Sequence, residues 1–214
     1  MSGAEELPLV AVYVDESCLG NGAEGDNPGA AGGVIEYRLP GDGRVARRDF
    51  WRAAPATTNN RMALASLIEA FAILAQKGGR FRVVFTSDSQ YLIKGMREWV
   101  PGWMARGWRR KGGRIENLAL WQEAVERVRA HQVDWQWVRG HVGHVQNEYA
   151  NFLAVRAARD QTASDGAVSS GFDAWLAAER AAGRMHAEPA PFPDPRRFRA
   201  ARPLPAAAPA TLLD

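Results

Sequence analysis

The sequence predicts an α/β domain of the mixed α+β kind, in which helices flank one mixed sheet. Five short runs rich in apolar and β-branched residues indicate strands, and three of them precede the first helix. The longer segments between the later runs place apolar residues at helical spacing. This order is typical of a mixed sheet with helices packed on it. A length of 214 residues accommodates one such domain with an appendage.

The residues at the ends of these runs indicate where the strands begin and end. The first run ends abruptly in two adjacent carboxylates, Asp15 and Glu16, and residues 17–30 are rich in Gly, Asn and Pro, which indicates a loop. The second and third runs are joined through Asp42-Gly43, a hairpin signal. The fourth run is continuously apolar, which suits a strand covered on both faces. We expect the strands at residues 8–15, 31–39, 44–52, 81–85 and 133–138.

Helical spacing of apolar residues marks three main helices. The first one stops at Gly78-Gly79, a pair typical of a helix C-terminus. Two shorter pieces are interrupted by Pro101-Gly102. We expect the main helices at residues 61–77, 115–130 and 147–159, and the short pieces at residues 89–95 and 98–107.

The composition shifts to Ala, Pro, Ser and Arg after about residue 162. We therefore divide the chain into a domain over residues 1–162 and an Ala/Pro-rich C-terminal tail over residues 163–214. One short amphipathic helix is possible at residues 172–182, and residues 187–209 are expected to be extended or disordered. We favour a flexible tail over one that docks on the domain or binds a partner.

Charge and cysteine content exclude few functions but indicate a compartment. The net charge of +3 and a pI near 9.3 permit a polyanionic partner without demanding one. The single cysteine, Cys18, fits a reducing compartment. The N-terminus is acidic, and no apolar run approaches the length that spans a membrane. We expect a soluble cytoplasmic protein, and nothing in the chain suggests an obligate dimer, so we expect a monomer.

Two strand ends carry carboxylates that suit a metal site. A buried strand that ends in Asp15 and Glu16 needs a cation or a charge pair, because a desolvated carboxylate is costly. Asp88 follows the fourth strand in the same way, although alone it serves equally well as a helix N-cap. Hard divalent cations prefer oxygen ligands, and strand ends hold such ligands rigidly.

Four blocks of residues in the same order resemble type 1 ribonuclease H over residues 8–160. The interleaved tryptophans of residues 99–121 strengthen that resemblance. It implies a ribonuclease H-like fold, with a five-stranded mixed sheet whose first three strands are antiparallel. It also implies an endonuclease that hydrolyses the RNA strand of RNA–DNA hybrids with two divalent cations, Mg²⁺ or Mn²⁺. The blocks are Asp15-Glu16-Ser17-Cys18-Leu19-Gly20-Asn21, Thr57-Thr58-Asn59-Asn60-Arg61-Met62, Thr86-Ser87-Asp88-Ser89-Gln90-Tyr91 and Trp137-Val138-Arg139-Gly140-His141-Val142-Gly143-His144.

Two of the family's four acidic positions are not acidic in this chain. The helix glutamate that follows Asn-Asn-Arg-Met is Ala63 here, and the aspartate that opens the last helix is Asn151. An engineered knock-out, a degenerate non-catalytic relative and a rearranged site are competing explanations. Glu69 is six residues from Ala63 and about 120° around the helix, so we expect it to point elsewhere.

Glu16 is the better candidate for a compensating acid. Type 1 enzymes typically have glycine after the first aspartate, whereas type 2 enzymes carry an adjacent Asp-Glu pair on this strand. Neighbours on an ideal strand point to opposite faces, so Glu16 can contribute only if the strand bends, bulges or ends there. Asn151 can offer its amide oxygen, with a weaker field than a carboxylate. We therefore expect Asp15, Glu16, Asp88 and Asn151 to be the metal ligands, Mn²⁺ being one possible preference.

The resemblance also implies a catalytic histidine and a substrate-binding surface. His141 would assist proton transfer or product release, with His144 as a substitute if the loop moves; an exposed loop histidine is the plainer alternative. A basic stretch over residues 106–114 would hold phosphates, and neutral polar groups would contact groove edges and 2′-hydroxyls without reading sequence. The expected substrate-binding residues are Asn21, Thr58, Asn59, Asn60, Arg61, Gln90, Trp103, Arg106, Trp108 and Arg109.

Two expectations remain, one on the burial of the tryptophans and one on alternative functions. We expect Trp99 and Trp121 in the core, and Trp103 and Trp108 partly at the surface. The alternative to an enzyme is a non-catalytic module that binds RNA–DNA hybrids or other duplexes on the same fold. A transposase- or integrase-like nuclease is a weaker possibility, against which the Asn-Asn-Arg-Met and Gly-His blocks speak.

Overall fold

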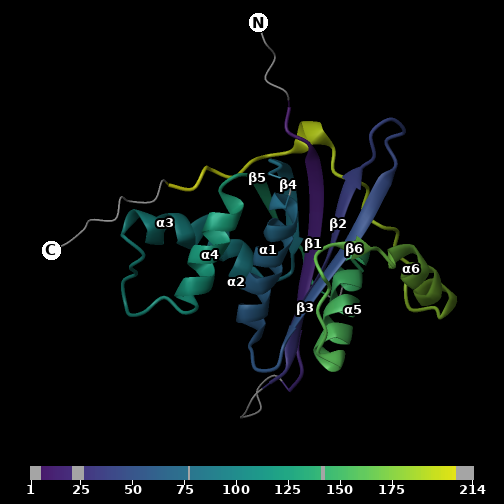
Figure 1. Ribbon diagram of the computed structural model, residues 1–214, viewed down its shortest axis with the longest axis horizontal. Helices are drawn as coiled ribbons and strands as arrows, with labels where there is room; N and C mark the ends of the chain where they lie inside the picture. The colour runs from purple at the N-terminus through teal and green to yellow at the C-terminus, as the bar shows by residue number, and fades with distance from the viewer. Residues whose placement is uncertain (1–5, 21–26, 77, 141–142, 206–214) are drawn as a thin grey trace, which may run out of the picture.

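The computed structural model describes residues 6–20, 27–76, 78–140 and 143–205. One twisted sheet runs through the molecule, with its strands in the order β5-β4-β1-β2-β3-β6 (Figure 1). β1, β2 and β3 are antiparallel neighbours, and β4 and β5 run parallel to β1. The strands are β1 (Leu9–Cys18), β2 (Gly29–Arg38), β3 (Val45–Ala54), β4 (Arg82–Ser87), β5 (Gln132–Trp137) and β6 (Val168–Ser169).

The mixed sheet is confirmed, but it has six strands in place of the expected five. The additional strand, β6, comes from the tail and pairs antiparallel with β3, placing Ser169 opposite Arg48. It is only two residues long, so no period-2 pattern in the sequence could mark it.

The first two strands also extend into the segment expected to be a loop. β1 continues through Cys18, and Cys18 pairs with Gly29 at the start of β2. Gly29 allows this pairing because a Cβ there would lie 2.6 Å from both Cys18 Sγ and the Thr57 methyl group. The expectation that β1 ends at Asp15 is therefore wrong.

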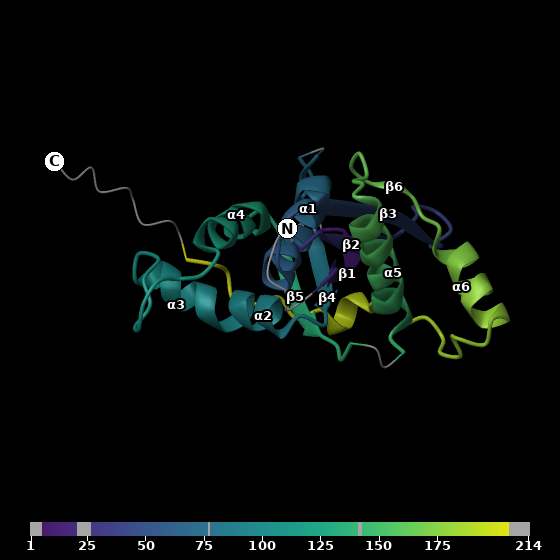
Figure 2. The same ribbon diagram turned by 90° about the horizontal axis from the view of Figure 1, so that it is seen from below.

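Helices cover both faces of the sheet (Figure 2). α1, α2, α3 and α4 share a core with one face, and α5 and α6 pack on the other. The two short helical pieces expected before and after residue 97 are joined by the π-helical turn η1, so that they form one continuous stretch. The helices are α1 (Asn59–Ala75), α2 (Gln90–Lys94), η1 (Gly95–Trp99), α3 (Val100–Ala105), α4 (Leu118–Val128), α5 (Val145–Asp160), α6 (Phe172–Ala181) and the 3₁₀ turn η2 (Pro195–Arg197).

Alternation along β1 separates the two cores. Val12 and Val14 belong to the core beneath α1, whereas Ala11 and Tyr13 belong to the core beneath α5. By the same alternation Asp15 leaves the strand on the α5 face, and Glu16 leaves it on the α1 face.

The C-terminal segment packs onto the domain, in contrast to the flexible tail favoured from composition. Its helix α6 buries Phe172 and Leu176 in the core beneath α5. At the other end of the segment the Ala201 N–H donates to Val133 O at 2.7 Å, on the edge strand β5. The segment thus crosses the end of the sheet where β1 begins and reaches both edge strands (Figure 1). Residues 206–209 lie outside the described residues.

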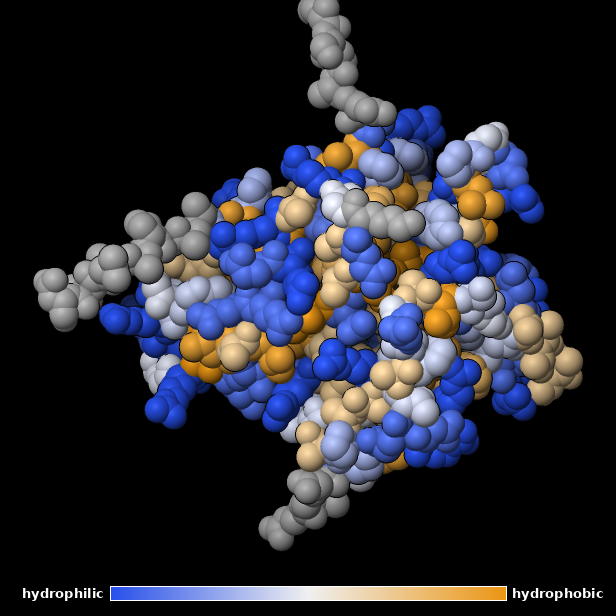
Figure 3. Space-filling view, in the orientation of Figure 1, coloured by the Kyte–Doolittle hydropathy of each residue, from blue (hydrophilic) through white to orange (hydrophobic). Residues whose placement is uncertain are grey.

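The surface combines charged and apolar residues without one dominant apolar area on the face shown in Figure 3. Within the described part of the chain, no helix is both long and apolar enough to cross a bilayer.

Candidate active site

Three carboxylates converge beyond the end of β4. One carboxylate oxygen from each of Asp15, Glu16 and Asp88 lies within 4.8 Å of the others. Asp15 is 5% exposed, and the other two residues are half-buried. Pairing between β1 and β4 ends with Val14 opposite Ser87, so beyond this point β1 has an open edge among the described residues.

This open edge explains how neighbours on one strand contribute to the same cluster. Glu16 stays in register opposite Ala31, so the strand neither ends nor bulges there. The sequence-based expectation that Glu16 could contribute only at such an irregularity is therefore wrong. The two side chains leave β1 on opposite faces. Both can turn toward Asp88 because no strand separates the faces beyond β4. Asp15 Oδ1 also accepts the Glu16 N–H at 2.7 Å, which fixes the Asp15 carboxylate beside the strand.

The electrostatics of the cluster favour a cation. Burial, together with the charges of Asp88 and Glu148, raises the pKa of Asp15 to about 8. Burial, with the charges of Asp15 and Asp88, also raises the pKa of Glu16 well above its ordinary value. Glu16 Oε2 is buried and has no hydrogen-bond partner among the described residues. A buried carboxylate oxygen without a donor, next to like charges, fits a divalent metal ligand.

The position of the missing helix glutamate supports the contribution of Glu16. Ala63 is completely buried in the same core as Val14, on the face of β1 that carries Glu16. Glu69 is held elsewhere by an ion pair with Arg52 at 3.3 Å, as its helical position predicted.

The start of α5 approaches the same cluster. Asn147 is buried and donates from Nδ2 to Val14 O at 3.1 Å, next to Asp15. Glu148 is close enough for its charge to affect the pKa of Asp15. Asn151 lies three residues further on the same helix face, and both residues line one cavity of about 640 Å³. The helix thus places Asn151 on the side of the cluster opposite α1.

Several residues around the cluster were given no role from the sequence. A Cβ at Gly140 would lie 2.2 Å from Asp88 Oδ2, so any larger residue there would displace the Asp88 carboxylate. The Trp137 indole N–H donates to Asp88 O at 3.0 Å and helps to fix the end of β4. Glu148 had one usable signal, its i, i+3 spacing from Asn151 on the last helix. Gly140 and Trp137 belong to the fourth block of the resemblance, but their contacts with Asp88 follow only from three-dimensional proximity.

The two loop histidines have different outcomes. His141, like the substrate candidate Asn21, lies outside the described residues. His144 caps α5, because its Nδ1 accepts the Asn147 N–H at 3.4 Å, and its ring lies 5.5 Å from that of Tyr13. Burial lowers the pKa of His144. The catalytic part assigned to His141, and to His144 as its substitute, stays a prediction.

The polar substrate candidates gather at two helix starts. Thr58 caps α1 by accepting the Arg61 N–H, and Arg61 itself is exposed. Asn59 and Asn60 form the first turn of the same helix, where Asn59 Oδ1 is buried without a hydrogen bond among the described residues. Gln90 begins α2 two residues after Asp88 and is exposed.

The basic stretch is exposed, but its tryptophans differ from expectation. Trp121 is completely buried as expected, whereas Trp99 is only half-buried. Trp103 is 8% exposed, so its expected surface position is wrong. It packs edge-on against Trp121 at 5.7 Å, because η1 joins the short helices into one rod over the core. Trp108 is half-buried, as expected. The exposed cations are Arg106, Arg109, Arg110, Lys111 and Arg114.

Comparison with known proteins agrees with this geometry. The family model described as RNase H matches residues 8–159. The chain belongs to the ribonuclease H family. A Ribonuclease H from Stutzerimonas stutzeri is 40% identical over 148 residues, which are 69% of this chain and 89% of that protein. A Ribonuclease H from Halorhodospira halophila is 41% identical over 151 residues, which are 70% of this chain and 93% of that protein.

A solved structure covers the C-terminal segment as well. The chain is 59% identical to LC9-RNase H1, described as a type 1 RNase H with the type 2 active-site motif. The superposition has a TM-score of 0.88 and covers 97% of this chain and 98% of that one. The RNase H domain of a foamy virus, at 18% identity and a TM-score of 0.59, shares the fold. As a member of the ribonuclease H family, the chain is a nuclease with an acidic cluster suited to divalent metal.

Proposed function

We propose that the chain is an endonuclease that hydrolyses the RNA strand of RNA–DNA hybrids, largely independently of sequence. The observation that carries this proposal is the convergence of Asp15, Glu16 and Asp88 within 4.8 Å, with one buried Glu16 oxygen lacking a hydrogen-bond donor. Membership of the ribonuclease H family supplies the reaction class. Structural similarity to LC9-RNase H1, with its type 2 active-site motif, supports an adjacent Asp-Glu pair in place of a helix glutamate.

The residues that would hold metal are Asp15, Glu16, Asp88 and Asn151. Two divalent cations, Mg²⁺ or Mn²⁺, would supply an activated water and neutralise the charge that develops on the phosphate. The chain would contribute rigid ligands from within β1 and from the residue that follows β4, with a neutral amide oxygen from α5. A neutral Asn151 keeps a fourth negative charge out of a cluster whose pKa values are already raised.

Substrate contact is assigned to two surfaces. The starts of α1 and α2 present Thr58, Asn60 and Gln90, and Gln90 lies two residues after Asp88. Such groups can hydrogen-bond to 2′-hydroxyls and so distinguish RNA from DNA. The exposed cations of residues 106–114 would hold the phosphates of the other strand, which gives affinity without sequence readout. His141 would assist proton transfer or product release.

A direct cleavage assay tests the proposal. A short end-labelled RNA–DNA hybrid is incubated with the full chain in Mg²⁺ or Mn²⁺, beside double-stranded RNA and double-stranded DNA of the same sequence and length. The expected result is internal cleavage of the RNA strand in the hybrid alone, lost in Asp88→Asn. Binding of the hybrid without cleavage in either metal would contradict the proposal and favour a non-catalytic binding module.

A further inference from the structure

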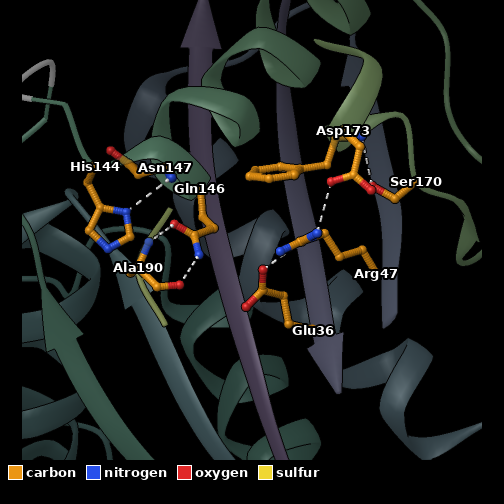
Figure 4. A network of polar contacts seen from close by, with 9 residues as sticks. Glu36, Arg47, His144, Gln146, Asn147, Ser170, Asp173 and Ala190 are labelled. Atoms are coloured by element: carbon orange, nitrogen blue, oxygen red, sulfur yellow. Dashed lines mark hydrogen bonds and ion pairs between the residues drawn. The ribbon is translucent and has the colours of Figure 1, made fainter. Parts of the chain in front are cut away.

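The C-terminal segment follows the 8–159 range that the family model matches. Part of this segment lies against the start of α5. Gln146, in the first turn of α5, is completely buried. Its Nε2 donates to Ala190 O at 2.8 Å, and the Ala190 N–H donates to its Oε1 at 3.0 Å (Figure 4). Both ends of one buried amide are therefore satisfied by one residue of the tail.

The chain on either side of Ala190 is held against the same region. Met185 is buried in the core beneath α5, together with Tyr13. Arg180 forms an ion pair with Glu188 at 2.7 Å. Ala187 is packed close to Gly143, where an added Cβ would lie 3.7 Å away. Residues 183–190, which we call the tail brace, thus have a defined course along the start of α5.

A short path of contacts connects the tail brace with the acidic cluster. Gln146 is followed by Asn147, whose side chain donates to Val14 O. Val14 directly precedes Asp15 on β1. The start of α5 is therefore fixed from two sides, by β1 through Asn147 and by the tail brace through Gln146 (Figure 4 shows the second contact).

The tail brace also borders the part of α5 that carries the proposed ligand. Met185, His186 and Ala187 line the same cavity of about 640 Å³ as Glu148 and Asn151. A movement of the tail brace would shift the first turn of α5. Because a helix transmits such a shift as a rigid element, the turn that carries Asn151 would move relative to β1.

We infer that Gln146 is a positioning residue for the metal site, acting through Ala190. By clamping the tail brace to the start of α5, it fixes Asn151 relative to Asp15 and Asp88. The C-terminal segment is on this view a structural part of the active site, even though it lies outside the domain that the family shares. The inference rests on the proposed function of the acidic cluster.

Substitutions of Gln146 and of Ala190 test this inference in the full-length protein. Gln146→Met keeps the side-chain length but removes both hydrogen bonds, and Ala190→Pro removes the tail N–H. Ala201→Pro is the matched control, because it removes a backbone bond of the same segment, to Val133 O, at the opposite end of the sheet. Mn²⁺ binding is measured by titration calorimetry, and the melting temperature without metal is measured for each variant.

A positioning role for the Gln146–Ala190 contact predicts a pattern of Mn²⁺ affinities that a purely structural contact would not give. Gln146→Met should weaken Mn²⁺ binding about tenfold, the lower end of the range for residues that support metal ligands. Ala190→Pro should weaken it less, the double variant no more than Gln146→Met, and Ala201→Pro not at all. Mn²⁺ binding as tight in Gln146→Met as in the parent, or equally weakened in Ala201→Pro, would overturn the inference. A parent that binds Mn²⁺ without cleaving hybrid would refute the proposed function, while these comparisons would still decide the role of Gln146.

Discussion

The backbone N–H of Glu16 donates to Asp15 Oδ1 at 2.7 Å, although the two side chains leave β1 on opposite faces. The strand continues through both residues and does not need to bend, because β4 has already ended on that side. Two adjacent carboxylates can therefore share one site with Asp88.

The metal-free protein should lose stability as the pH rises. Burial and neighbouring charges raise the pKa of Asp15 from 3.8 to about 8, so the folded state binds more protons than the unfolded state between these values. Stability is then fully present at the acidic end of this window and is lost as the pH rises through it. Melting curves in a chelator should show this fall, and Asp15→Asn should make it shallower. A melting temperature that rises over this window, with a chelator present, would be incompatible with a desolvated cluster.

Asn151→Asp should lower the requirement for metal. A carboxylate adds a full negative charge to the site, and cation affinity increases with the number of charged ligands. We expect half-maximal cleavage of hybrid at an Mg²⁺ concentration about tenfold lower than in the parent. Asn147 and Asn117 are unsuitable as control positions, because their amides donate to Val14 O and to the Tyr91 hydroxyl. Gln122→Glu, which adds the same charge at an exposed position of α4, is the control. If Asn151→Asp needs as much metal as the parent, the weak-field account of Asn151 is wrong.

Removing a cation from the basic stretch should weaken hybrid binding in a salt-dependent manner. Arg109 is exposed and lies in a run of cations without an acid. Arg109→Ala should reduce the slope of log affinity against log salt by about 0.9, the value for one released counterion. Arg199→Ala, an exposed arginine of the tail on the β5 edge, serves as the control. The same slope in Arg109→Ala and in the parent would remove Arg109 from the substrate surface.

The C-terminal segment should contribute strongly to stability. Phe172 is completely buried against Tyr149, and the Arg47 guanidinium lies 4.3 Å from its ring (Figure 4 includes Arg47). Phe172→Ala should cost about 3–5 kcal/mol, because it leaves a cavity in a well-packed core. Phe198→Ala, at a half-buried ring over Arg82, should cost clearly less. Equal effects of the two changes in urea denaturation would mean that α6 is not anchored through Phe172.

The sequence predicted those features that depend on local pattern. The five main strands, the long helices and the short tail helix follow from periodicity and end signals. Asp15 and Asp88 follow from their positions at the ends of apolar runs. The family was evident from four ordered blocks, and its match to residues 8–159 confirms it.

The remaining features depend on packing that sequence patterns do not encode. The continuation of β1 past Glu16 depends on Gly29 lying opposite Cys18, and the burial of Trp103 depends on η1 joining two helical pieces. Composition gave no sign that Ala190 pairs with Gln146, because the two residues are far apart in the chain and are joined only in the fold. The docking of a tail rich in Ala and Pro rests on a few well-placed apolar residues, not on its average composition.

The central claim is that Glu16 provides the acid missing at Ala63, and one comparison of cleavage rates tests it most directly. Hybrid cleavage in Mg²⁺ and in Mn²⁺ is measured for the parent, Glu16→Gln and Glu69→Gln, the last being the nearest helix acid and already paired with Arg52. The account predicts that Glu16→Gln lowers the rate by about 100-fold or more, as expected on loss of a metal ligand, while Glu69→Gln retains the parent rate. Parent-like cleavage by Glu16→Gln, or a comparable loss in Glu69→Gln, would contradict it.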